Sequence, residues 1–118
     1  MVKINCRQVD GVSIVDVVGR ITLGDGSALL RDTIRGLVAG GERQILVNLG
    51  EVNYIDSSGL GELVSAFSAV RGEGGELKLL GLTRKVHDLL QITKLYTVFD
   101  IHNDEAQAIA SYEPRHAH

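Results

Sequence analysis

The chain has 118 residues, which is enough for one domain of ordinary size and too few for two. Apolar residues make up 44% of it and charged residues 23%, which are the proportions of a folded globular domain and exclude intrinsic disorder. The 12 lysine and arginine residues are scattered and outnumbered by 15 acidic residues, so the net charge of −3 makes nucleic acid a poor candidate partner.

The chain opens with a pattern that is typical of a β-hairpin. Apolar and polar residues alternate over 2–7, which predicts a half-buried strand in which Cys6 faces the core as a small apolar residue. The β-branched run 12–18 follows the turn signal Asp10-Gly11 and predicts the second strand. Asp16 within this run is either a member of a buried ion pair or, more often for such a residue, a mark of the solvated face.

A helix, a buried strand and a second helix are predicted next. Apolar residues between 29 and 38 have helical spacing, with Ser27 available as the N-terminal cap and Gly40-Gly41 as the stop. The short apolar run 45–47 is typical of a strand that is buried on both faces. A second apolar helical face extends from 60 to 70 and ends at a cluster of glycines.

The last third of the chain predicts two more strands and two more helices. The leucines of 77–80 indicate a strand, and Thr83 precedes a helix. The run 98–101 indicates a final strand, and 104–112 indicates a closing helix. The inward side chains of this helix are predicted to be Ala106, Ile109 and Ala110.

The order of elements is β-β-α-β-α-β-α-β-α, which predicts an α/β fold in which helices cross over between mainly parallel strands. The opening hairpin adds an antiparallel pair, so we expect a mixed sheet of about five strands flanked by about four helices. We expect one domain over residues 1–112 and a flexible C-terminal tail over 113–118.

The location of the protein is predicted from what the sequence lacks. No stretch approaches the roughly 18 consecutive apolar residues of a membrane span, and the N-terminus lacks the apolar core of a signal peptide. The single cysteine, Cys6, cannot form an internal disulfide, so no oxidising compartment is needed. We therefore expect a cytoplasmic protein.

The motif Asp56-Ser57-Ser58-Gly59-Leu60-Gly61 lies between a predicted strand and a predicted helix. One interpretation is capping, which the local pattern favours, since Asp and Ser oxygens accept hydrogen bonds from free helix amides and Ser58 is well placed for this. The other interpretation is that Ser57 is displayed at the positive end of the helix dipole, where a phosphoryl group would meet free N–H donors. Asp56 opposes such a phosphate by like-charge repulsion.

Other site chemistries find little support in the sequence. Glycine is missing two positions before Ser57 and before Ser58, so the nucleophile elbow of a hydrolase is absent, and an enzyme with a serine nucleophile is a distant alternative. The dinucleotide-binding fingerprint lacks its third glycine at Leu29, and no phosphate-binding Gly-Lys-Ser/Thr occurs. One cysteine and dispersed histidines predict no metal site, and we expect no cofactor and no catalytic residue.

In this order of elements, the motif at 56–61 resembles the signature of bacterial anti-sigma factor antagonists of the STAS class. The resemblance runs through nearly the whole chain. It includes a turn at Gly19, residues 45–49 leading to Tyr54-Ile55-Asp56, residues 74–79, Gly81-Leu82-Thr83, Val86, Leu89-Leu90, Ile92-Thr93, Leu95 and Val98-Phe99.

The resemblance implies a STAS fold and a phosphorylation-switched binding module rather than an enzyme. The phosphoacceptor of the family directly follows the aspartate of the motif, which implies Ser57 here. The phosphosite loop and partner-binding residues implied are Asp56, Ser58, Gly59, Leu60 and Gly61, with further contacts from the exposed face of the second helix. Two partners are implied. One is an ATP-binding anti-sigma factor serine kinase, which releases a sigma factor when the unphosphorylated antagonist binds. The other is a serine phosphatase.

Arg20 and Thr22 depart from the family pattern, because they stand where many antagonists carry acidic residues. We expect this departure to change the charge near the phosphosite loop. Two alternatives follow: a partner that differs from the standard kinase of the family, or easier accommodation of a phosphate. Lys94, where glycine is common, is expected to affect only a turn. The alternative is a STAS subunit of another partner-switching, sensory or lipid-transport assembly in which Ser57 is never phosphorylated.

Overall fold

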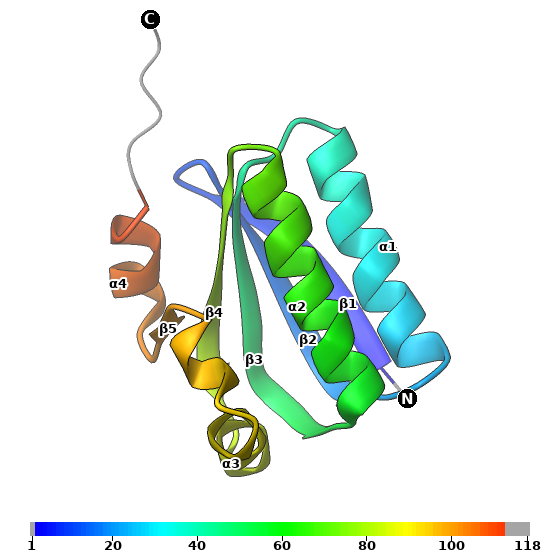
Figure 1. Ribbon diagram of the computed structural model, residues 1–118. Coiled ribbons are helices and arrows are strands. Elements are labelled where there is room, and N and C mark those ends of the chain that lie inside the picture. Colours follow the sequence, from blue (N-terminus) through cyan, green and yellow to red (C-terminus); the bar gives the residue numbers. More distant parts are fainter. Residues whose placement is uncertain (1, 113–118) are drawn as a thin grey trace, which may run out of the picture.

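A five-stranded mixed sheet forms the frame of the structure, a computed structural model that describes residues 2–112 (Figure 1). The strands follow chain order across the sheet: β1 (Val2–Val9), β2 (Val12–Ile21), β3 (Gln44–Ile55), β4 (Glu76–Leu82) and β5 (Ile101–His102). β1 and β2 are antiparallel and the other neighbouring pairs are parallel. The predicted α/β class with an N-terminal hairpin is confirmed, and the tail predicted at 113–118 lies outside the described residues.

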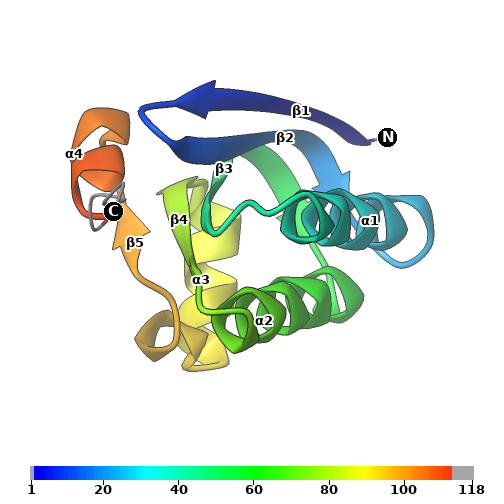
Figure 2. The ribbon, with the colours of Figure 1, turned by 90° about the horizontal axis from the view of Figure 1, so that it is seen from above.

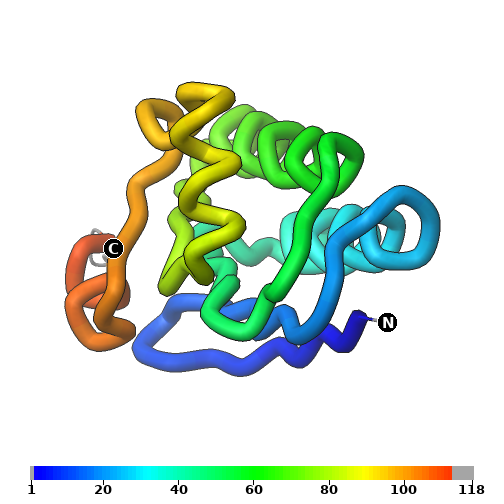
Figure 3. Tube along the Cα trace, turned by 90° about the horizontal axis from the view of Figure 1, so that it is seen from below, coloured from blue at the N-terminus to red at the C-terminus, as the bar shows by residue number. Residues whose placement is uncertain are grey.

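Helices α1 (Asp25–Ala39) and α2 (Ser57–Gly72) lie side by side on one face of the sheet, where they connect parallel strands (Figures 1 and 2). After β4 come α3 (Arg84–Ile92) and a short 3-10 helix, η1 (Leu95–Thr97), and α4 (Glu105–Ala110) covers part of the opposite face. Figure 3 views the molecule from the end at which β2 and β3 finish, where their connections to α1 and α2 leave the sheet.

The central strand is covered on both faces. Ile45, Leu46 and Val47 are all fully buried, which confirms the predicted doubly buried strand. Ile45 and Val47 belong to the main core that α1, α2 and α3 complete, whereas Leu46 faces the other way. The smaller cluster on that side consists of Val12, Ile14, Leu46, Leu80, Ala108 and Tyr112.

Three expectations for the first third of the chain are wrong, two of them from local sequence pattern and one from the family resemblance. Cys6 is exposed, whereas Val2 and Ile4 earlier in the same strand pack against the main core. Gly24 rather than Ser27 occupies the N-cap of α1, and the buried Ser27 hydroxyl donates to the Thr22 carbonyl at 2.9 Å. Gly19 lies within β2, next to a register shift, and its φ of 109° favours glycine there.

Asp16 is a member of a half-buried ion pair, one of the two interpretations left open by the sequence. Arg7 Nε donates to Asp16 Oδ2 at 2.7 Å, and Asn48 Nδ2 donates to Asp16 Oδ1 at 2.8 Å. Arg7 also pairs with Glu105, so this cluster joins β1, β2 and β3 to the start of α4.

The last strand is shorter and later than predicted. It comprises Ile101–His102 rather than 98–101, because η1 turns the chain and the following segment places Phe99 in the main core. Lys94 precedes η1 with a left-handed φ of 62°, so its position is indeed in a turn.

The orientation of α4 also differs from the prediction. Ala106 and Ala110 are exposed, whereas Ala108 is buried and Ile109 packs beside it. Tyr112 fixes this orientation, because its buried hydroxyl donates a hydrogen bond to the Ile45 carbonyl of β3. A helix of six residues is too short for its own periodicity to decide which side faces the sheet.

Candidate functional site

The motif at 56–61 forms the junction between β3 and α2. Ile55, the last residue of β3, is buried in the main core, which fixes the chain up to this point. Asp56 follows in an extended conformation, with φ −100° and ψ −176°, and α2 begins at Ser57. An extended residue before the first helical one is an N-cap, whose side chain turns back over the free amides of the first turn.

Asp56 joins the start of α2 to the loop that leads into α1. Its Oδ1 accepts a hydrogen bond from the Gly59 amide at 2.9 Å, and its Oδ2 accepts one from the Leu23 amide at 2.9 Å. The Asp56 amide donates to the Ile21 carbonyl at 3.2 Å. The Gly59 and Leu23 amides stabilise the carboxylate and lower the pKa of Asp56 below its ordinary value of 3.8, so the group is charged at neutral pH.

Gly59 is required for the close approach of α2 to the end of β2. A Cβ atom at this position would lie 2.3 Å from the Ile21 carbonyl oxygen and 2.8 Å from Cγ1 of Ile55. No side chain fits at these distances, so glycine here permits the helix to start directly against the sheet. At Gly61, by contrast, a Cβ atom would meet nothing within 4 Å.

The two serines of the motif have different surroundings. Ser57 is exposed, as expected. It is the first residue of α2, and its hydroxyl makes no hydrogen bond within residues 2–112. Ser58 is half-buried, and the expectation that it caps the helix is wrong, because the Asp56 carboxylate occupies the Gly59 amide. Ser58 instead lines a surface groove of about 480 Å³ between the first turns of α1 and α2.

The other motif residues that the resemblance implied for partner binding are partly buried in the core and partly exposed. Leu60 is 6% exposed and packs in the main core, and Gly59 is also buried. These two residues therefore position the loop and are not available to a partner protein. Gly61 is exposed beside Ser58 on the surface groove.

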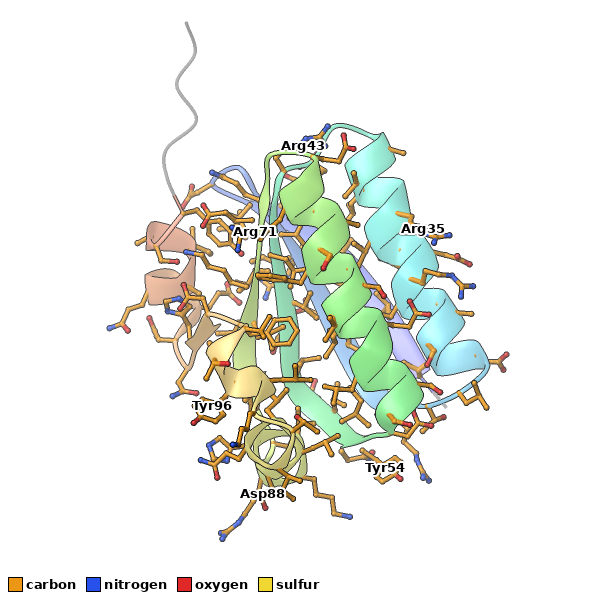
Figure 4. The ribbon with its side chains drawn as sticks, viewed as in Figure 1. Arg35, Arg43, Tyr54, Arg71, Asp88 and Tyr96 are labelled. Carbon is orange, nitrogen blue, oxygen red and sulfur yellow. The ribbon has the colours of Figure 1, made fainter. Side chains whose placement is uncertain are left out.

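Three exposed side chains that the motif does not include lie at the same junction. Leu23, whose amide binds Asp56, is 79% exposed. Arg20 and Tyr54 are partners on β2 and β3, and the Arg20 guanidinium carbon lies 4.8 Å from the centre of the Tyr54 ring. Figure 4 shows Tyr54 at the end of the molecule where α2 starts. The sequence alone showed that position 20 is basic where the family is often acidic. The contact of Arg20 with Tyr54 depends on strand register, which the sequence did not show.

The histidines and acidic residues of the described part of the chain do not gather into a second site. Residues 2–112 contain no group of three or more His, Cys, Asp or Glu side chains that could hold a metal ion. His87 is exposed on α3, where its ion-pair contact is with the neighbouring Asp88. Within the described part of the chain, no helix has the length and apolar character needed to cross a membrane.

Comparison with known sequences gives a family and several relatives. The STAS domain family model matches residues 3–108. The anti-sigma-B factor antagonist of Bacillus subtilis is 31% identical over 100 residues, which cover 85% of this chain and 90% of that protein. The anti-sigma-B factor antagonist of Listeria monocytogenes is 41% identical over 61 residues, 52% of this chain and 54% of that protein, so this match spans about half of that relative.

Comparison with solved structures supports the fold. The crystal structure of an anti-sigma factor antagonist from Mycobacterium paratuberculosis superimposes with a TM-score of 0.81 at 21% identity, covering 94% of this chain and 93% of that one. The phosphorylated form of the Bacillus cell fate determinant SpoIIAA gives a TM-score of 0.71 at 17% identity, covering 92% of this chain and 97% of that one. At these identities the likeness shows a shared fold.

Proposed function

The chain belongs to the STAS domain family, and we propose that it is an anti-sigma factor antagonist whose binding is switched by phosphorylation of Ser57. In the unphosphorylated form it binds an anti-sigma factor that is also an ATP-dependent serine kinase, and the bound kinase releases its sigma factor. A serine phosphatase restores the binding form. The names of the relatives from Bacillus subtilis and Listeria monocytogenes, both anti-sigma-B factor antagonists, support an anti-sigma factor as the partner.

The observation that carries the proposal is the exposed and unbonded hydroxyl of Ser57 on a rigid support. Within residues 2–112 this hydroxyl has no hydrogen-bond partner, and Asp56 fixes the backbone on its N-terminal side through two backbone amides. A kinase can therefore reach the hydroxyl without unfolding the helix. Ser58, which is half-buried at the groove between α1 and α2, offers less access.

The phosphoryl transfer needs no catalytic group from this chain. The Ser57 oxygen attacks the γ-phosphorus of ATP, an O–P bond forms, the bond to the β-phosphate oxygen breaks, and ADP leaves. The hydroxyl proton passes to a base of the kinase, which also supplies the metal ion. The antagonist contributes the positioned hydroxyl, so we propose a regulatory binding protein rather than an enzyme.

The switch follows from the charge that the phosphate adds. A phosphoserine carries about −1.5 to −2 charges at neutral pH. It would stand beside the Asp56 carboxylate, which is already charged and already occupies the Gly59 amide. The start of α2 therefore has less capacity to neutralise a second anion than a free helix N-terminus has. Repulsion and the cost of desolvating both anions then disfavour the complex.

The test is titration with each purified serine-kinase anti-sigma factor of the source organism. With ADP present, we expect the parent protein to bind one of them and to displace its sigma factor from a preformed complex. With ATP present, we expect one phosphate to be transferred and the affinity to fall. Absence of binding to every such kinase would favour the alternative, a STAS subunit of another assembly.

A further inference from the structure

We propose that Arg20 is a specificity-determining contact for the anti-sigma factor, and that it binds a carboxylate on the surface of that partner. The inference rests on the proposed function, because it names the chemistry that the partner must present opposite the ends of β2 and β3. The partner chemistry is an acidic side chain set in an apolar surface.

Arg20 carries a positive charge that has no ion-pair partner within residues 2–112. Its side chain is exposed, and its guanidinium contacts the Tyr54 ring. Arg7, by contrast, pairs with a carboxylate of the same chain. The Asp56 carboxylate at the same junction is engaged by the amides of Leu23 and Gly59. The charge of Arg20 is therefore available to another molecule.

The contact with Tyr54 orders the Arg20 side chain, which favours the binding of a planar anion such as a carboxylate. The guanidinium carbon lies 4.8 Å from the centre of the Tyr54 ring, which is within the range of a cation–π contact. The Arg20 guanidinium donates no hydrogen bond within residues 2–112, so two of its N–H groups can bind the two oxygens of one carboxylate. Because the side chain is already ordered by the ring, less conformational entropy is lost when it binds.

Strand register places this pair beside Ser57. Arg20 is the partner of Tyr54 across β2 and β3, and the next residue, Ile21, accepts a hydrogen bond from the Asp56 amide at 3.2 Å. The backbone that carries Arg20 is thus joined to the residue immediately before Ser57. A protein that binds around the Ser57 hydroxyl therefore reaches the Arg20 side chain as well.

The neighbouring apolar surface indicates a protein rather than a small anion. Leu23 is 79% exposed and Tyr54 is 39% exposed at this end of the molecule. A free anion would leave both side chains in water, whereas a protein surface would cover them. Arginine and tyrosine are enriched among the residues that dominate protein interfaces, especially where apolar neighbours exclude water.

The experiment compares two charge reversals of equal size. Arg20→Glu changes the proposed contact, and Arg35→Glu is the matched control. Arg35 is also exposed and has no ion-pair partner within residues 2–112, but it lies on α1 well away from Tyr54 (Figure 4). The probe is the purified serine-kinase anti-sigma factor that binds the parent protein with ADP. We expect Arg20→Glu to raise the Kd about tenfold or more, mainly through faster dissociation, and Arg35→Glu to change it less than about twofold.

Two further variants separate stacking and charge from a structural defect. Tyr54→Leu keeps the charge but removes the stacking face, so we expect a smaller rise in the Kd, about threefold. Replacing the facing acidic residue of the anti-sigma factor with arginine is expected to restore the binding of Arg20→Glu and to weaken that of the parent. All of these antagonist variants are expected to melt like the parent, because the substituted side chains are exposed.

The outcomes distinguish this inference from the proposed function. If the parent binds an anti-sigma factor and Arg20→Glu binds it as tightly as Arg35→Glu does, the contact is overturned while the proposed function stands. The same conclusion follows if no acidic-to-arginine change in the anti-sigma factor restores the binding of Arg20→Glu. If the parent binds no anti-sigma factor, the proposed function fails and the inference fails with it.

Discussion

The Leu23 amide donates a 2.9 Å hydrogen bond to Asp56 Oδ2, joining two residues that are 33 positions apart in the chain. The other oxygen of the same carboxylate accepts from the Gly59 amide in the first turn of α2. One side chain therefore holds both the entry to α1 and the start of α2. A change at Asp56 must affect the exposed Leu23 loop as well as the helix that presents Ser57.

Removal of the Asp56 charge is expected to reduce stability at neutral pH and to matter less in acid. The folded-state pKa of Asp56 lies below its ordinary value of 3.8, so its stabilising contribution is fully present above that value. The contribution disappears as the pH falls through the lower folded-state pKa. We expect the melting temperatures of the parent and Asp56→Asn to differ at pH 7 and to converge below pH 3.8. A difference that is constant from pH 7 to pH 2 would contradict this assignment.

Gly59→Ala is expected to destabilise the protein, and Gly61→Ala is the matched control two residues later. The added methyl group at position 59 would lie 2.3 Å from the Ile21 carbonyl oxygen, so the start of α2 must move, at a cost of about 1–3 kcal/mol. At position 61 the methyl group meets nothing within 4 Å, and alanine in a helix is favoured over glycine by roughly 0.5–1 kcal/mol. Urea unfolding of both variants measures the difference, and equal stabilities would show that the close approach at Gly59 is absent.

Phosphorylation is expected at Ser57 and not at Ser58. Ser57 is exposed with a free hydroxyl, whereas Ser58 is half-buried beside the groove between α1 and α2. Phosphopeptide mapping after reaction with ATP and the partner kinase identifies the acceptor. We expect Ser57→Ala to accept no phosphate and Ser58→Ala to accept one. Labelling that persists in Ser57→Ala would show that the assignment is wrong.

A carboxylate at position 57 is expected to weaken binding more than loss of the hydroxyl does. Ser57→Asp places a second negative charge next to Asp56 at a surface that the partner desolvates, and like-charge contacts of this kind are strongly unfavourable. Ser57→Asn introduces a side chain of nearly the same shape as aspartate but without its charge. Ser57→Ala removes only an exposed hydroxyl. Titration against the partner with ADP is expected to give similar Kd values for Ala, Asn and the parent and a higher one for Asp. Equal Kd values for all four proteins would mean that the loop acts only as a helix cap.

Element order and the place of the site could be predicted from sequence because their signals act over a few residues. The alternation of apolar and polar residues over 2–7 predicted β1, and the continuous apolar run 45–47 predicted the buried strand β3. The change from strand to helix periodicity after Ile55 predicted α2. The Asp and Ser residues of the motif likewise predicted a helix start at this point of the chain, with Ser57 exposed there. These are properties of backbone geometry, which each residue type favours or disfavours locally.

Tertiary structure alone decided which groups meet at that site. Asp56 rather than Ser58 caps α2, and the second oxygen of Asp56 binds the amide of Leu23 in a different loop. The stacking of Arg20 on Tyr54 requires a particular register of β2 against β3. Hydrophobic pattern determines which face of a strand is buried, but a slip of two residues keeps the same face, so the pattern leaves open which residue of a neighbouring strand lies alongside. The sequence therefore determined where Ser57 would be presented, and only the packed sheet determined the charged and apolar surface around it.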